Sequence, residues 1–208
     1  MTRLGLARVL AVAAIVYAAA FYFVGASIKP GYSQVANFIS EYNAAGTAYA
    51  GLLTYAGFAV VAALLAGFLI AVAPRARVQG ASRAGMWALW AAPASFAMAA
   101  VFPCDAGCPI EDGSFSQEMH NLLAVATYLV TGLSLILLSR APVLAVEARW
   151  ARLFLLASGV AWIVMFGVML LPEMAPVRGL VQRSLDALLA GSLLIVAFAL
   201  AKPKAAPA

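Results

Sequence analysis

The chain has 208 residues, of which 65% are hydrophobic and 10% are charged, and its formal net charge is +5. A soluble domain of this length could not bury so much apolar surface, so the composition excludes an ordinary globular protein. The 13 basic residues lie in short breaks between apolar runs, which is typical of membrane topology signals and not of nucleic-acid binding.

Six apolar runs of the length that a membrane helix needs follow one another along the chain. They predict an all-α polytopic membrane protein, a single bundle of six transmembrane helices within residues 1–201. The expected spans are residues 8–27, 50–73, 86–102, 121–139, 153–171 and 180–201, and residues 202–208 are expected to be a disordered tail. The first run is longer than a signal-peptide core, so we expect it to remain as an anchor.

The orientation follows from where the basic residues fall. If the N-terminus is cytoplasmic, only Lys29, Arg178 and Arg183 of the basic residues lie in outer segments. Because cytoplasmic segments of membrane proteins carry the excess of Lys and Arg, both termini are predicted to be cytoplasmic. We expect a multi-pass protein of the inner (plasma) membrane.

The first outer segment has a helical period. Val35, Phe38, Ile39 and Tyr42 are spaced like one face of a helix, and Ser33 is placed to cap its start. This pattern predicts a short amphipathic helix that lies in the outer interface or folds over the mouth of the bundle. A plain surface loop is the alternative.

Both cysteines, Cys104 and Cys108, flank a tight turn in the second outer segment. On the oxidising side of a membrane this spacing favours a disulfide. Two alternatives stay open: a free thiol pair in a redox relay, and a metal site made of both thiolates, His120 and a carboxylate. Our expectation is a disulfide and no metal.

The only histidine, His120, opens the fourth span, and Asp105 follows the third. Because these spans form a hairpin, both side chains reach the outer mouth of the bundle, where Glu41 also lies. A histidine beside a carboxylate is typical of general acid–base chemistry. We therefore regard His120, Asp105 and Glu41 as candidate catalytic residues. The alternative is that His120 only caps a helix or bonds a loop carbonyl.

The last span carries charge inside the apolar run. Charges in hydrocarbon are costly, so Asp186 is a candidate functional residue. Arg183, three residues earlier, is expected to pair with it on the same helix face, beside Gln182. With Ser40 and Tyr32 of the first outer segment, these residues form the predicted ligand-binding set. A purely structural ion pair between Arg183 and Asp186 is the alternative.

Several missing features exclude function classes. No lysine lies within a span, which excludes a retinal Schiff base, and a single histidine excludes a bis-histidine haem. Neither familiar glycine-rich phosphate-binding loop is present, and no two spans carry charges near mid-membrane as ion-coupled transporters do. We expect no cofactor.

The segment from Phe102 to Cys108, Phe-Pro-Cys-Asp-x-Gly-Cys, and the following His120 resemble the core signature of a known family. This is an uncharacterised prokaryotic six-helix membrane family catalogued as domain of unknown function 998. Pro30-Gly31-Tyr32 with Ile39-Ser40-Glu41, and the segment Gly179–Arg183, resemble its two other motifs. The chain departs from the pattern at Tyr42-Asn43, where relatives are expected to carry Leu-Gly. The resemblance covers nearly the whole chain and implies the fold, but no settled activity.

These observations favour an integral membrane protein that binds or processes a lipid or other amphiphile at the outer end of its bundle. Its expected partners are membrane lipid or a lipid-like small molecule. Whether it is an enzyme stays open; the fitting class would be a hydrolase or acyltransferase acting on outer-leaflet lipid. The alternative is a non-enzymatic receptor, assembly factor or partner-binding module with a structural polar cap.

Overall fold

The computed structural model describes residues 1–202, and it is all-α. Within these residues six segments are long and apolar enough to cross a membrane, which confirms the predicted six-helix bundle. They are Arg3–Ile28, Ala50–Arg75, Ala81–Val101, Phe115–Leu138, Arg149–Met169 and Arg178–Leu200. Residues 203–208 of the predicted tail lie outside the described residues.

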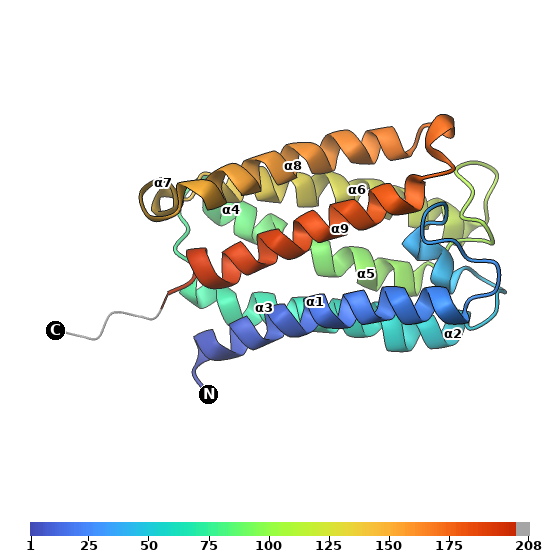
Figure 1. Cartoon of the computed structure of the whole chain (residues 1–208), viewed down its shortest axis with the longest axis horizontal. Coiled ribbons are helices and arrows are strands. Elements are labelled where there is room, and N and C mark those ends of the chain that lie inside the picture. Colours follow the sequence, from blue (N-terminus) through green and yellow to red (C-terminus); the bar gives the residue numbers. More distant parts are fainter. Residues whose placement is uncertain (203–208) are drawn as a thin grey trace.

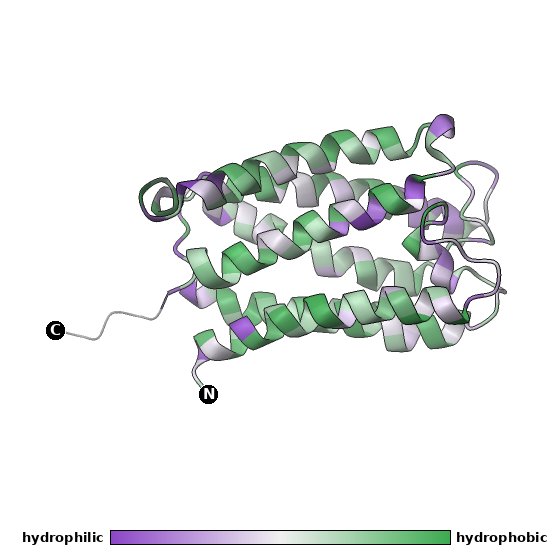
Figure 2. Cartoon of the chain, viewed as in Figure 1, coloured by the Kyte–Doolittle hydropathy of each residue, from purple (hydrophilic) through white to green (hydrophobic). Residues whose placement is uncertain are grey.

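The spans lie side by side along the long axis of the molecule, and both termini are at one end (Figure 1). We call this the terminal end; α7 (Pro142–Glu147) also lies there. The opposite loop end holds the connections at residues 29–49, 102–114 and 170–177. Figure 2 shows hydrophilic residues concentrated at both ends and mostly hydrophobic helices between them, as expected for helices in a bilayer.

The most extensive helix pair is α6 (Phe115–Leu138) packed on α8 (Arg149–Met169). The two helices touch through glycines: a Cβ at Gly159 would lie 2.7 Å from the carbonyl oxygen of Gly132. Small residues allow such close backbone approach between membrane helices. On one side α1 (Arg3–Ile28) packs on α3 (Val60–Val72), and α9 (Arg178–Ile195) packs mainly on α8.

The second and third spans are irregular, and the sixth ends in a π-helical segment, Val196–Leu200. The third span is divided into α4 (Ala81–Ala88) and α5 (Ala91–Val101). Pro93 has no N–H for the carbonyl of Leu89, which accepts instead from the N–H of Ala92 at 3.0 Å. The second span begins with α2 (Ala50–Leu53) and continues through a π-helical segment, Thr54–Ala59, before α3. The irregular segments of the second and third spans border the cavities described below.

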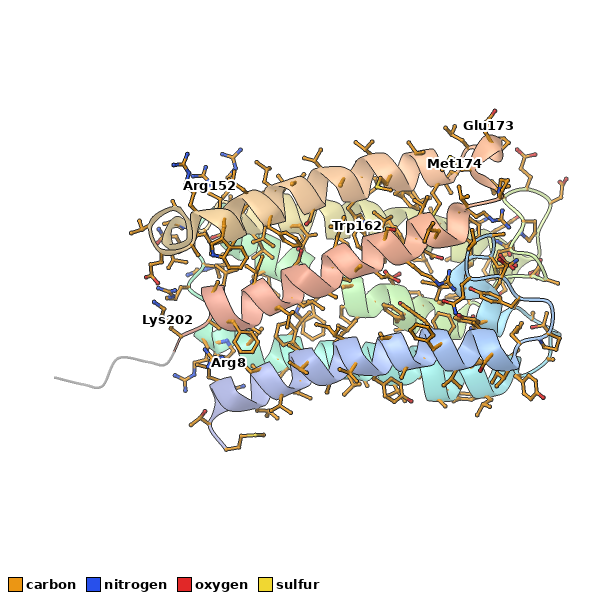
Figure 3. The ribbon with its side chains drawn as sticks, viewed as in Figure 1. Arg8, Arg152, Trp162, Glu173, Met174 and Lys202 are labelled. Atoms are coloured by element: carbon orange, nitrogen blue, oxygen red, sulfur yellow. A yellow bond between two sulfur atoms is a disulfide. The ribbon has the colours of Figure 1, made fainter. Side chains whose placement is uncertain are left out.

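The terminal end is held by charges. Glu147 of α7 accepts from Arg77 at 2.7 Å and also pairs with Lys202. Hydrogen bonds from Arg77 and then Lys202 lower the pKa of Glu147 to about 2. Figure 3 shows Arg8, Arg152 and Lys202 at this end and Glu173 at the other.

Candidate functional site

The connection between the first two spans, residues 29–49, folds over the loop end; we call it the cap loop. Phe38, Ile39 and Tyr42 are buried, whereas Val35 is 46% exposed. The cap loop contains one 3₁₀ turn, η1 (Ile39–Asn43), so the predicted amphipathic α-helix is wrong in kind. The carbonyl groups ahead of this turn bond α9 instead of continuing a helix.

The cap loop rests on the first turn of α9. Leu180 donates its N–H to the carbonyl of Val35 at 2.9 Å, and the Ile39 N–H donates to Oε1 of Gln182 at 2.6 Å. At Gly179 the contact is so close that a Cβ would lie 2.2 Å from the carbonyl oxygen of Asn37. A glycine is therefore required where the loop crosses the helix.

Arg183 holds the cap loop from below. Its two terminal nitrogens donate to five oxygens: the carbonyls of Gln34, Asn37 and Gly179 and the hydroxyls of Tyr32 and Tyr42. The guanidinium carbon lies 5.6, 5.9 and 6.0 Å from the ring centroids of Tyr32, Tyr42 and Tyr22. Burial raises the pKa of Tyr32, so its hydroxyl is protonated at neutral pH.

The prediction of an ion pair between Arg183 and Asp186 is wrong. Neither residue belongs to the three ion pairs found within residues 1–202, because the Arg183 side chain extends toward the oxygens of the cap loop. Asp186 instead accepts a hydrogen bond from the Tyr22 hydroxyl on Oδ2, at 2.7 Å. Its Oδ1 accepts from no group within the described part of the chain. Asp186 therefore keeps unused hydrogen-bonding capacity.

The expected contact between Asp105 and His120 does not form either. The Asp105 carboxylate accepts from the backbone N–H of Ser114 at 2.7 Å and from its hydroxyl at 2.8 Å, which lowers the pKa of Asp105. His120 Nδ1 lies 2.8 Å from the Phe102 carbonyl oxygen. Because a carbonyl only accepts, Nδ1 carries the hydrogen and Nε2 of the neutral ring has a free lone pair.

Glu41 belongs to the inside of the cap loop. It is 8% exposed and accepts from the Phe38 N–H and from Nδ2 of Asn37, both at 2.8 Å. Arg178 lies 3.5 Å from the same carboxylate. The structure therefore separates Glu41, Asp105 and His120, and each of them bonds a neighbouring loop.

Cys104 and Cys108 are joined as a disulfide. The pair lies against the cap loop: the N–H of Ala45 donates to the carbonyl of Cys104 at 2.7 Å, and Oγ of Ser40 is 3.4 Å from Cys108 Sγ. With both sulfurs bonded to each other, neither is a thiolate ligand. Among residues 1–202 no three His, Cys, Asp or Glu side chains gather as a metal site requires, so the metal alternative finds no support.

A cavity of about 170 Å³ lies directly beneath the cap loop. Phe38, Ile39 and Ser40 of this loop line it together with parts of α5, α6, α8 and α9. We call it the upper cavity. Its wall is mainly apolar and includes aromatic rings. The polar members on the spans are Ser95, His120, Asn121, Tyr128, Thr131, Gln182 and Asp186.

A second cavity, of about 270 Å³, lies between α1, α3, α5 and α9; we call it the lateral cavity. Its wall is made largely of small and aliphatic side chains: Ala14, Ile15, Ala18, Ala19, Val61, Leu65, Ala187, Leu189, Ala190 and Leu193. Tyr22, Arg183 and Asp186 also line it. Phe96, Asp186 and Leu189 line both cavities, so the Asp186 carboxylate lies where the two meet.

Three aromatic residues near this junction were not among the predicted site residues. Tyr22 donates to Asp186, Tyr128 accepts from Nε2 of Gln182 at 2.8 Å, and Trp162 packs on Tyr128 with ring centroids 5.4 Å apart. Figure 3 shows Trp162 in the interior of the bundle. In the sequence, the only sign of these residues is a hydroxyl or indole group inside an apolar run. This is a weak indication of a site.

The model of a family described as Protein of unknown function (DUF998) matches residues 11–201. The chain belongs to this family. No curated protein and no solved structure matches it. In this DUF998 protein the three motifs quoted from the sequence meet in space. The cap loop carries the motif Pro30-Gly31-Tyr32 with Ile39-Ser40-Glu41. The disulfide segment and the start of α9 both bond to this loop.

Proposed function

We propose that this DUF998 protein binds a lipid or another amphiphile in the two cavities that meet at Asp186. The observation that carries the proposal is their contrast in lining. In the upper cavity several polar residues lie among aromatic and aliphatic ones, whereas the lateral cavity is lined mainly by alanine, valine, isoleucine and leucine, with Tyr22, Arg183 and Asp186 as its polar members. An amphiphile needs a polar and an apolar compartment in contact, and bundle interiors are common places for such sites.

The lateral cavity suits an alkyl chain. Its wall uses five alanines on α1 and α9, Ala14, Ala18, Ala19, Ala187 and Ala190, where larger side chains would fill the space. The two volumes, about 170 and 270 Å³, exceed the roughly 150 Å³ cavity that is known to bind benzene in an apolar protein core. Together they have room for a short chain with its polar end.

In this proposal the loop end faces away from the cytoplasm, in the inner (plasma) membrane of a prokaryote. The terminal end carries most of the basic residues, which favours the cytoplasmic side for both termini. The disulfide at the loop end supports the same orientation, because disulfides persist on the oxidising side of a membrane. The cavities would then be reached from the outer leaflet.

If the ligand is also a substrate, His120 is the residue placed to move a proton. It lines the upper cavity and has a free lone pair on Nε2. Asp105 would act as a positioning residue, since it bonds Ser114 at the start of the helix that carries His120. Hydrolysis or acyl transfer on an outer-leaflet lipid is the reaction class that this arrangement suits.

The test is native mass spectrometry of the protein purified with its own lipids. We expect retained lipid on the wild type and its loss in Ala18→Leu and Ala190→Leu, which fill the lateral cavity. Ala20→Leu is the matched control, because Ala20 is exposed on the same helix and does not line the cavity. A wild type without lipid, or an Ala18→Leu variant that retains as much lipid, would overturn the proposal.

The alternative of a partner-binding module with a structural polar cap is favoured by the cap itself. Arg183, Glu41 and Asp105 are bonded within the protein. In that case the cavities would be packing defects, and filling them would raise thermal stability without changing lipid content. The Ala190→Leu variant separates the two readings, since both quantities can be measured on one sample.

A further inference from the structure

Asp186 is a carboxylate within a membrane span that has one hydrogen-bond donor and no contact ion pair among the described residues. Only the Tyr22 hydroxyl bonds it within residues 1–202, and none of the ion pairs found there includes it. An ionised carboxylate without a counter-ion is costly at membrane depth. A ligand that brings a positive charge to Oδ1 would remove this cost.

The walls of the upper cavity are suited to a cation. Phe38, Phe58, Phe96, Tyr128, Trp162 and Phe166 line it, and no lysine or arginine does. Tyr128 packs against Trp162 and against Phe166, with ring centroids 5.4 and 4.7 Å apart. Aromatic rings attract cations through their electron-rich faces, and ammonium groups are the usual guests of such cages.

The chain already holds cations in this way nearby. The Arg178 guanidinium carbon lies 4.2 Å from the Phe38 ring centroid, and Arg183 lies among three tyrosine rings. Arg183 is the cation nearest to Asp186 along α9, but it lines the lateral cavity and its terminal nitrogens are used by the cap loop. It offsets part of the Asp186 charge through space and leaves Oδ1 without a donor.

We propose that the site selects amphiphiles whose polar end is an ammonium group, with Asp186 as its counter-ion. This rests on the proposed function, since it names the polar end of the same ligand. The ammonium donates to Oδ1 of Asp186 against the aromatic wall, and the alkyl chain lies in the lateral cavity. A phosphate or carboxylate end would be repelled by Asp186 and would find no cation in the upper cavity.

The experiment compares three probes of equal chain length on purified, delipidated protein: decylammonium, decanol and decyl phosphate. Binding is measured by calorimetry below the micellar concentration of each probe. We expect decylammonium to bind roughly tenfold or more tightly than decanol, as charge-assisted hydrogen bonds allow, and decyl phosphate to bind most weakly. Equal binding of decylammonium and decanol, or tighter binding of decyl phosphate, would overturn the inference.

The variant Asp186→Asn keeps the shape of the side chain and removes its charge. It is expected to lose roughly tenfold in decylammonium affinity and to bind decanol as the wild type does. Glu173→Gln, an exposed carboxylate at the loop end, is the control and should change neither. An Asp186→Asn protein that binds decylammonium unchanged would contradict the inference. If this variant does not fold, the comparison of probes on the wild type still decides.

Further outcomes show whether the ammonium group belongs to a lipid head group or to a free amine. They also distinguish failure of this inference from failure of the proposed function. Displacement of retained phosphatidylethanolamine by decylammonium, seen by native mass spectrometry, would identify a lipid head group. Tight decylammonium binding without such displacement would identify a free hydrophobic amine. If lipid is retained and decanol binds as well as decylammonium, only this inference fails. If no probe binds and Ala18→Leu changes nothing, the proposed function fails with it.

Discussion

Arg183 and Asp186 lie one turn apart on the same helix, and they differ in how many hydrogen bonds they make within the protein. The arginine donates to five oxygens of its own chain, whereas the aspartate has a single donor and borders two cavities. The terminal nitrogens of Arg183 are used within the protein, although its buried Nε has no partner among the described residues. A charge inside a membrane span is a functional candidate, and Asp186 also has an oxygen that accepts from no described group. In the function proposed above, Arg183 holds the cap loop and Asp186 meets the ligand, and the following experiments test that division.

The largest effect is expected at Arg183. Arg183→Met removes the donors of five hydrogen bonds, four of which link α9 to the cap loop. We expect the free energy of unfolding to fall by about 3 kcal/mol, measured by thermal and denaturant unfolding in detergent. Arg149→Met, at an exposed position of the terminal end, is the control. An Arg183→Met protein as stable as that control would show that Arg183 does not stabilise the fold.

A smaller loss of stability is expected at Gly179. Gly179→Ala places a Cβ 2.2 Å from the Asn37 carbonyl oxygen, so the cap loop must move away from α9. Overpacking of this kind costs about 2 kcal/mol. Gly167→Ala is the matched control, because no atom lies within 4 Å of its added Cβ, and it should stabilise α8 slightly. Equal melting temperatures for the two variants would show that the loop does not rest on α9.

Asp186 is expected to behave in the opposite sense to Arg183. In delipidated protein Asp186→Asn should raise the free energy of unfolding or leave it within about 0.5 kcal/mol, since it neutralises an unpaired charge in the membrane. Added decylammonium should then raise the melting temperature of the wild type and not that of the variant. A strong loss of stability in the variant without ligand would place Asp186 with Arg183 as a structural charge.

The smallest effect is expected at the terminal end, where Glu147 pairs with Arg77 and Lys202. These partners lower the pKa of Glu147 to about 2. The folded protein therefore binds this proton less readily than the unfolded chain, and the contribution of Glu147 is present above its unfolded pKa and lost as pH falls toward 2. The melting-temperature difference between wild type and Glu147→Gln should be constant from pH 7 to 6 and shrink below pH 4. A difference that grows in acid would contradict the pairing.

The sequence predicts the bundle well because hydropathy over each apolar run is a local property. It predicts the partners of charged groups poorly. Arg183 and Asp186 were correctly placed on one helix and incorrectly paired, because the spacing along a helix does not include the oxygens that a loop distant in sequence brings to Arg183. The expected Asp105–His120 contact fails for a different reason, because Asp105 bonds Ser114 within its own loop and His120 bonds the Phe102 carbonyl. Tyr22 and Tyr128 were missed because a tyrosine in an apolar run is compatible with burial.

The contact between the cap loop and α9 has a consequence for how the protein is made. Tyr32 and Arg183 are 151 residues apart in the chain. During synthesis the N-terminal segment emerges first, and its carbonyls find their donors only after α9 has been made. Closure of the cap therefore cannot precede the insertion of α9. A chain that stops before α9 would expose an unfinished surface to the proteases that remove incomplete membrane proteins.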